Sequence, residues 1–222
     1  MTKRSFAGKV ALVTGGGGRF GRVLCHALAQ RGCKIIVGDC DLTAARDAAA
    51  RSAGLALGLD VTDAAMWLNA AASARDLFGP LDYVFHCAHD AVEPIDAEGL
   101  ARLWATQLSA LELAKQICGT DLTTNGGAHI LFVSGAAWAP DPVRPLWSAA
   151  EAAKRSWHKA QQTPSTAVKS ALIAYDVPPH PSRKTADDEI AAATLWALSR
   201  GEAQAFVPGG FGVAGFCRKA AQ

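Results

Sequence analysis

Short apolar runs alternate with longer helical patterns along most of this chain. The apolar runs, rich in β-branched and aliphatic residues, are expected to form strands at 9–14, 34–38, 55–59, 83–87, 128–133, 167–174 and 204–207. Helical patterns are expected at 22–31, 42–51, 63–78, 100–117, 147–161 and 187–200. Strands that are apolar throughout and separated by helices are typical of a parallel sheet covered on both faces. The sequence therefore predicts an α/β fold: a Rossmann-like, doubly wound parallel sheet with helices on both faces.

Length and charge limit the domain organisation and the classes of partner. The 222 residues, half of them hydrophobic, suffice for one substantial core and not for two. No linker or repeat divides the chain, so we expect a single domain over 1–222. The net charge is +2 and basic residues are scattered, so we expect no nucleic-acid partner and no membrane partner. Without a bilayer-length apolar run or a signal-peptide core, we expect a cytoplasmic protein.

Cysteine and histidine residues form no recognisable metal-binding pattern. The six cysteines include no C-x-x-C pair, and without an export signal we expect them to be reduced. His86, Cys87 and His89 are close in sequence, but a closed zinc site needs four converging ligands. We expect Cys118 and His129 to lie elsewhere on the sheet, and therefore expect no metal site.

A run of glycines follows the first predicted strand, in the sequence VTGGGGRFGR at 13–22. In a doubly wound sheet this turn is the natural phosphate site, because unpaired N–H groups and the helix dipole converge there. Gly15–Gly18 give the turn the conformational freedom that it needs. Asp39 ends the second apolar run, IIVGD, where a carboxylate would bond a ribose 2′-hydroxyl and repel a 2′-phosphate.

These segments resemble the short-chain dehydrogenase/reductase family, in order and nearly from end to end. VALVTGGGGRFGR resembles the family's T-G-x-x-x-G-x-G loop, and IIVGDCDLTAA resembles its second strand with the acid that selects NAD. LDVTD, FGPLDYVFHCAH, ILFVSGAAW, VKSALIAYDVPP and AFVPGGFGVAG resemble later family segments. The resemblance implies NAD as the cofactor, with binding residues at Gly15, Arg19, Gly21, Asp39, Asp60 and Val61.

The resemblance fails at the residues that carry the family's chemistry. The Tyr-x-x-x-Lys motif falls on WSAAE, which puts Trp147 in place of the tyrosine and Glu151 in place of the lysine. The helix asparagine falls on Gln107, and the serine is kept as Ser134. The N-N-A-G segment becomes HCAH at 86–89. We therefore assign none of the four degenerate positions as catalytic.

The two exchanges in the motif both act against proton transfer. In the family, a tyrosine hydroxyl gives or takes a proton while a hydride moves to or from nicotinamide. The lysine cation favours the phenolate and lowers the phenol's pKa from ~10. The indole of Trp147 cannot release its proton near neutral pH, and an anionic Glu151 would raise the pKa of a neighbouring hydroxyl.

Two further departures concern the cofactor and the substrate lid. Arg19 replaces the middle glycine of the loop, and its side chain either points outwards and clamps a phosphate or lies across the site and blocks it. We expect impaired NAD binding, although Asp39 argues for a retained site. Ten residues separate Asp176 from Asp187, where the family usually carries a longer helical lid, so we expect a shortened lid.

Three functional hypotheses follow. The leading one is a catalytically inactive subunit that supports a catalytically intact family member, as a hetero-oligomer and in particular a heterotetramer. It resembles the two-subunit NAD-dependent hydroxyacyl-CoA dehydrogenase of the benzylsuccinate route. The alternative is an NAD-dependent oxidoreductase with a rebuilt active site, using Ser134 and either His86 or His89. The third is a free-standing protein that senses NAD without turnover.

Overall fold

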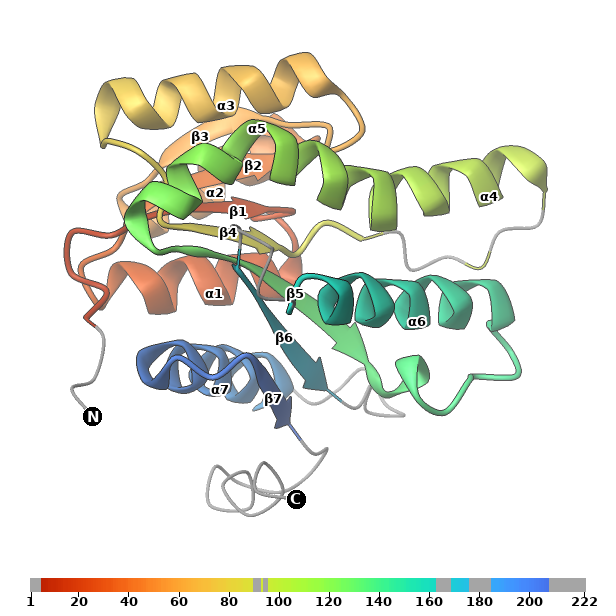
Figure 1. The fold of residues 1–222 in the computed structure, drawn as a ribbon. Helices are drawn as coiled ribbons and strands as arrows, with labels where there is room; N and C mark the ends of the chain where they lie inside the picture. The colour runs from red at the N-terminus through yellow and green to blue at the C-terminus, as the bar shows by residue number, and fades with distance from the viewer. Residues whose placement is uncertain (1–4, 90–92, 94–95, 163–168, 176–184, 208–222) are drawn as a thin grey trace.

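A computed structural model describes residues 5–89, 93, 96–162, 169–175 and 185–207 (Figure 1). Its core is one parallel sheet of seven strands in the order β3-β2-β1-β4-β5-β6-β7. The strands are β1 (Val10–Thr14), β2 (Lys34–Asp39), β3 (Leu55–Gly58), β4 (Tyr83–His86), β5 (Ala128–Ser134), β6 (Lys169–Tyr175) and β7 (Gln204–Val207). The predicted α/β, doubly wound fold is confirmed.

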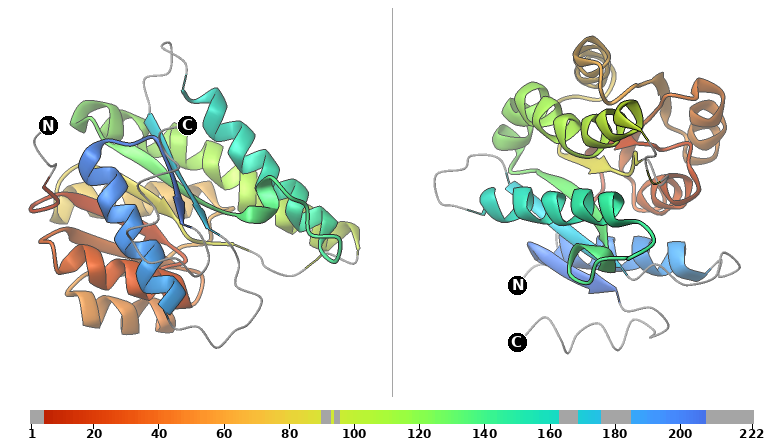
Figure 2. Two further views of the ribbon diagram at one scale, coloured as in Figure 1. Left: turned by 90° about the horizontal axis from the view of Figure 1, so that it is seen from below. Right: turned by 90° about the vertical axis from the view of Figure 1, so that its right-hand side faces the viewer.

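Helices cover both faces of this sheet (Figures 1 and 2). Helices α1 (Arg19–Ala29), α2 (Leu42–Ser52) and α7 (Thr185–Arg200) lie on one face. On the other lie α3 (Ala64–Leu77), α5 (Ala110–Asn125) and α6 (Pro145–Ala160). Helix α4 (Ala97–Trp104) continues into α5 through a π-helical turn, η1 (Ala105–Ser109), and runs alongside α6. A short 3₁₀ turn, η2 (Gly135–Ala137), follows β5.

Strand β1 shows why its sequence is apolar throughout. Ala11 and Val13 pack on the face of α1, α2 and α7, whereas Val10 and Leu12 pack on the face of α3 and α5. Successive side chains of a strand point to opposite faces, so a strand covered on both sides needs apolar residues at every position.

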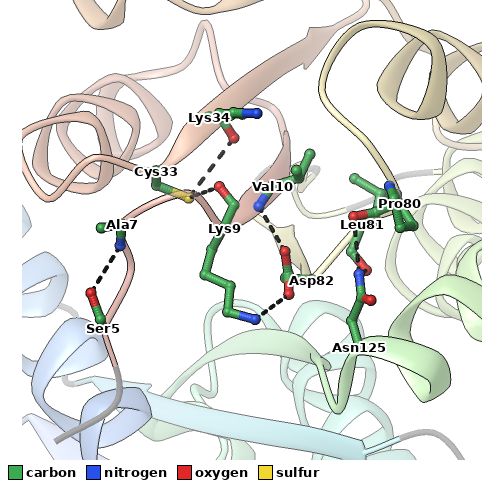
Figure 3. A network of polar contacts seen from close by, with 10 residues as sticks. All are labelled: Ser5, Ala7, Lys9, Val10, Cys33, Lys34, Pro80, Leu81, Asp82 and Asn125. Atoms are coloured by element: carbon green, nitrogen blue, oxygen red, sulfur yellow. Dashed lines mark hydrogen bonds and ion pairs between the residues drawn. The ribbon is translucent and has the colours of Figure 1, made fainter.

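A polar network holds the amino ends of β1 and β4 together (Figure 3). The Asp82 carboxylate accepts from the Val10 N–H at 2.9 Å and from the Lys9 ammonium at 2.6 Å. Nearby, the Asn125 amide donates to the carbonyls of Pro80 and Leu81. At the opposite edge, the loops at the carboxyl ends of the strands line two cavities.

Three helix boundaries differ from the sequence prediction by three residues or more. Helix α1 begins at Arg19, not at 22, because Gly21 belongs to its first turn and packs against the Gly15 carbonyl. The helix predicted at 100–117 begins earlier, at Ala97 after the Asp96 cap, and its last segment runs past Gly119 to end at Asn125. Of the predicted short lid at 176–187, residues 176–184 lie outside the described residues, and 185–187 form the beginning of α7.

Candidate functional site

The glycine loop forms a tight turn at the carboxyl end of β1. Gly15 has φ +62°, and a Cβ there would lie 2.7 Å from the Ala88 backbone nitrogen, so glycine is required. The Gly16 N–H donates to the Gly38 carbonyl at 3.1 Å, and the Gly18 N–H donates to the Gly15 carbonyl at 3.1 Å. The loop thus delivers the chain to the first turn of α1, whose N–H groups have no intrahelical acceptor.

One side of this loop opens on a cavity of about 550 Å³. Its lining includes Asp39, Asp60, Val61 and Thr62, together with Gly15 of the loop. The Asp39 carboxylate accepts from the Gly17 N–H at 2.9 Å and the Asp41 N–H at 3.0 Å. These bonds fix the carboxylate at the end of β2 and leave further acceptor capacity on its oxygens. The structure thus brings together the residues expected around adenosine.

The Asp60 carboxylate is hydrogen-bonded within its own turn. One of its carboxylate oxygens accepts from both the N–H and the hydroxyl of Thr62, at 2.8 Å and 2.7 Å. Val61 is buried, and its carbonyl accepts from the Trp67 indole at 2.9 Å. Asp60 and Val61 therefore shape the wall of the cavity through a fixed backbone.

The other side of the loop opens on a second cavity, of about 330 Å³, between α1, α6, β6 and α7. Gly21 lines it together with charged and aromatic side chains, among them Arg19, Arg144, Trp147, Glu151, Lys154 and Tyr175. His86 and His89 lie on its wall.

Arg19 reaches across this cavity to α7. Its Nε lies 3.2 Å from Oδ2 of Asp187; the arginine side chain is 68% exposed and the aspartate side chain 8% exposed. Burial raises the pKa of Asp187, and the Arg19 cation acts in the opposite direction. The guanidinium is therefore held against α7, and a bound phosphate would have to compete with Asp187 for it.

Glu151 and Lys154 form a buried ion pair on α6. Lys154 Nζ lies 2.5 Å from Glu151 Oε1, and the other Glu151 oxygen accepts from the Ser134 N–H. Lys154 also donates to the Phe132 carbonyl at 2.9 Å. The Glu151 anion expected from the sequence therefore lies beside a counter-charge, Lys154, three residues further along α6. That spacing is visible in the sequence and was the available signal.

The Trp147 side chain lines the 330 Å³ cavity and is buried. It is 4% exposed, and the Arg144 guanidinium stacks 4.2 Å from its ring centre. The backbone N–H groups of Leu146 and Trp147 donate to the Glu93 carboxylate at 2.9 Å and 3.0 Å, at the beginning of α6. Its indole N–H has no hydrogen-bond partner within the described part of the chain.

Gln107 lies in the π-helical turn between α4 and α5. It is 2% exposed, and its Nε2 has no acceptor among the described residues. Gln107 lines a small cleft under β4 and β5 with Thr14, His86 and Lys154. The periodicity of 100–117 does not reveal this turn. Gln107 lines the cleft and is not among the lining residues of the 330 Å³ cavity, although His86 and Lys154 line both.

Tyr175, at the end of β6, was not anticipated from the sequence. It is a phenol on the wall of the 330 Å³ cavity. Burial raises its pKa above the ordinary value, and the Glu151 carboxylate raises it further. A phenol that works as a general acid and base near neutral pH needs the opposite shift.

His86 and His129 contact each other on neighbouring strands, which corrects the expectation that His129 lies elsewhere. His86 Nε2 lies 3.0 Å from His129 Nδ1. Burial lowers the pKa of His129 to about 3 and holds the pKa of His86 well below 6.5. Over the described residues, no cluster of three or more histidine, cysteine, aspartate or glutamate side chains could hold a metal ion.

The structure does not assemble the rebuilt site of the alternative hypothesis. Ser134 is fully buried, and its hydroxyl accepts from the Ala136 N–H at 3.3 Å. His86 is paired with His129. His89 is exposed and its Nδ1 lies 3.0 Å from the Cys87 carbonyl. No hydrogen bond joins Ser134 to either His86 or His89 in the described structure.

A family model described as short chain dehydrogenase matches residues 9–170, so the chain belongs to the short-chain dehydrogenase family. Among curated proteins, it is 34% identical over 137 residues to 2,5-dichloro-2,5-cyclohexadiene-1,4-diol dehydrogenase LinX of Sphingobium indicum, covering 58% of this chain and 55% of that protein. It is 30% identical over 137 residues to sorbitol dehydrogenase of Cereibacter sphaeroides, covering 59% and 54%. The chain spans about half the length of the curated relatives it matches.

Solved structures show the same fold. A short chain dehydrogenase/reductase from Burkholderia phymatum in complex with NAD superposes with a TM-score of 0.81 at 17% identity, covering 91% of this chain and 90% of that one. A 3-ketoacyl-(acyl-carrier-protein) reductase from Brucella melitensis complexed with NADH gives 0.81 at 23% identity, covering 93% and 99%.

Two further observations bear on the cysteines and on membranes. The cysteines that the structure describes, Cys25, Cys33, Cys40, Cys87 and Cys118, are all free, and Cys40 alone among them is exposed. Cys217 lies outside the described residues. No helix in the described ranges has the length and apolar character needed to span a bilayer.

Proposed function

We propose that this chain is a non-catalytic short-chain dehydrogenase subunit that assembles with a catalytically intact family member into an NAD-dependent dehydrogenase. The observation that carries the proposal is the contact set of Glu151. This residue stands where the family motif has its lysine, and it is bound to Lys154 and to the β5 backbone. Beside it, Trp147 offers an indole where the motif has a phenol.

The remaining titratable groups support the same proposal. The phenol of Tyr175 has a raised pKa, and His86 is held neutral against His129. A positioned general acid or base contributes roughly 10²–10⁴-fold to rate, so a cavity in which neither Tyr175 nor His86 is tuned for that role is a poorer site for hydride transfer coupled to proton transfer. The geometry therefore favours a binding or structural role over turnover.

The loop fits one half of the family's cofactor. Gly15 leaves room for close backbone approach, and Asp39 is fixed where the family's acid meets the adenosine ribose. We propose that Gly15, Gly21 and Asp39 would hold the adenosine end of NAD. The nicotinamide end would supply hydride transfer, and this chemistry also needs a group that transfers a proton. The other half meets Trp147 and the Arg19–Asp187 pair.

Exposed apolar side chains support assembly through the α6 side of the molecule. Trp138, Val143 and Leu146, on the segment entering α6, are 37%, 80% and 38% exposed. Exposed apolar side chains that gather in one patch are typical of protein interfaces, and these three lie within nine residues of the sequence. We propose that the partner covers this segment and the adjoining helices α5 and α6, in a heterotetramer.

The names of the relatives suggest a substrate class for the assembly. The curated relatives are named as dehydrogenases of a diol and of sorbitol, and a structural neighbour is a 3-ketoacyl reductase. All of these act on a hydroxyl and carbonyl pair. We propose a hydroxyacyl substrate, as a CoA thioester, turned over by the partner.

Co-expression with a short-chain dehydrogenase of the same organism that keeps the Tyr-x-x-x-Lys motif tests the proposal. We expect the two chains to co-purify, and the substitutions Val143→Glu and Leu146→Glu to abolish co-purification without unfolding the chain. Leu68→Glu, on the exposed face of α3, is the matched control and should change nothing. Two chains that elute separately, with this chain alone oxidising an alcohol, would contradict it.

A further inference from the structure

Arg19 follows the glycine loop, where a phosphate would bind, but its side chain is paired with Asp187 on α7. It is the first residue of α1, and it lines the 330 Å³ cavity. Its partner Asp187 is 8% exposed, whereas the Arg19 side chain is 68% exposed. An ion pair in which one partner is largely in water contributes little to stability, because solvent screens the charge. The guanidinium is therefore available to a stronger anion.

A phosphate group with free oxygens is such an anion. It offers several acceptors and more than one negative charge, and arginine matches it with two parallel hydrogen bonds. The first N–H groups of α1 would contact the same phosphate. Arg19, Arg144 and Lys154 line this cavity, against the carboxylates of Glu151 and Asp187. Each of these cations is paired with a carboxylate, Arg144 with Asp141 and Lys154 with Glu151, and Arg19 is the most exposed of the three.

We propose that the glycine loop and Arg19 form a site for an adenosine diphosphate that ends in a free terminal phosphate. The adenosine would lie in the 550 Å³ cavity beside Asp39, and the terminal phosphate would take Arg19 from Asp187. This inference rests on the proposed function only in treating the glycine loop as a nucleotide site.

A terminal phosphate fits this corner better than the inner phosphates of a dinucleotide. In NAD each phosphate is joined to a ribose by an ester bond and to the other phosphate by an anhydride bond, so it carries a single charge and fewer free oxygens for Arg19. The remainder of the dinucleotide would also have to enter the cavity past the Arg19–Asp187 contact and lie against Trp147. ADP would form the contact with Arg19 and has no further group that must enter the cavity.

Calorimetric titration of the full chain with ADP, AMP, ADP-ribose and NADH, without divalent metal, tests the proposal. We expect ADP to bind about tenfold or more tightly than AMP, ADP-ribose or NADH, which is the size of a charge-assisted contact. ADP binding no more tightly than AMP or ADP-ribose would overturn the proposal.

Three variants separate Arg19 from general effects of charge. Arg19→Ala should abolish the preference for ADP over AMP while AMP affinity stays within about twofold. Arg31→Ala, which removes an exposed cation just beyond the other end of α1, should keep the preference. Asp187→Asn should strengthen ADP binding, because it releases the guanidinium. An unchanged preference in Arg19→Ala would overturn the proposal, whether or not the chain proves to be catalytically silent.

Discussion

The Lys154 ammonium lies 2.5 Å from the Glu151 carboxylate, less than one helical turn away on α6, and both side chains are less than a tenth exposed. Glu151 also accepts from the Ser134 N–H, and Lys154 donates to the Phe132 carbonyl. The pair therefore attaches α6 to β5. Glu151 and Lys154 are thus part of the framework that holds this helix against the sheet.

Breaking this pair should destabilise the fold strongly. Lys154→Met leaves a buried carboxylate without its counter-charge, and we expect a loss of about 3–5 kcal/mol in the free energy of unfolding. The double variant Glu151→Leu with Lys154→Met should lose less than Lys154→Met alone. Urea denaturation measures both. Lys115→Met, which removes a more exposed partner of Glu112 at 3.8 Å, should cost under about 1 kcal/mol; equal losses in the two methionine variants would refute the framework role.

Gly15→Ala should damage the glycine loop without any ligand being present. The alanine would need φ +62° and would bring a Cβ within 2.7 Å of the Ala88 backbone. We expect the free energy of unfolding to fall by about 2 kcal/mol or more. Gly58→Ala is the control, because a Cβ there would meet nothing within 4 Å. We expect it to change the free energy of unfolding by no more than about 0.5–1 kcal/mol, the usual size of a glycine-to-alanine effect in a strand. Indistinguishable thermal midpoints for the two variants would contradict this geometry.

The buried histidine pair should make the fold sensitive to acid. Burial lowers the pKa of His129 from 6.5 to about 3, so the folded chain takes up this proton less readily than the unfolded chain. The stabilisation is therefore complete above about pH 6.5 and is lost as pH falls towards 3. We expect roughly 2–3 kcal/mol to disappear by about pH 4.5.

Denaturant titrations between neutral and acid pH measure this loss. His129→Gln should flatten the dependence on pH, and His26→Gln, at an exposed position on α1, should leave it unchanged. A wild-type chain whose unfolding free energy is constant across this range would show that His129 is not held neutral by burial.

Asp39→Ala should weaken the binding of every adenosine nucleotide by about tenfold or more. The carboxylate is lost both as a ribose acceptor and as the acceptor of the Gly17 N–H, which fixes the loop. Calorimetry with ADP and NADH measures the effect, and Asp47→Ala, on the exposed side of α2, is the control. Equal binding by the two variants would remove Asp39 from the site.

Sequence periodicity predicted the order of strands and helices because burial on both faces leaves a direct trace in composition. The central residues of β1, β2 and β5 are apolar for this reason, and the α7 and β7 patterns reappear nearly at their expected bounds. The glycine loop and Asp39 were predictable as well, since a phosphate turn and a strand-end acid occupy fixed places in a doubly wound sheet.

The contacts that define the second cavity were not predictable, because each joins segments distant in the chain or depends on local backbone irregularity. Arg19 meets Asp187 across two helices, and His86 meets His129 across a strand pair. The π-helical turn around Gln107 has no composition signal. Lys154 is the exception: its spacing from Glu151 is readable in the sequence.

The rate of NADH formation by the chain purified alone, with NAD and either sorbitol or a hydroxyacyl-CoA, tests the central claim most directly. The account predicts no rate above the enzyme-free background, for the wild-type chain and equally for Tyr175→Phe and His89→Ala. A measurable rate in the wild-type chain that disappears in either variant would contradict it, because that side chain would then be moving the proton.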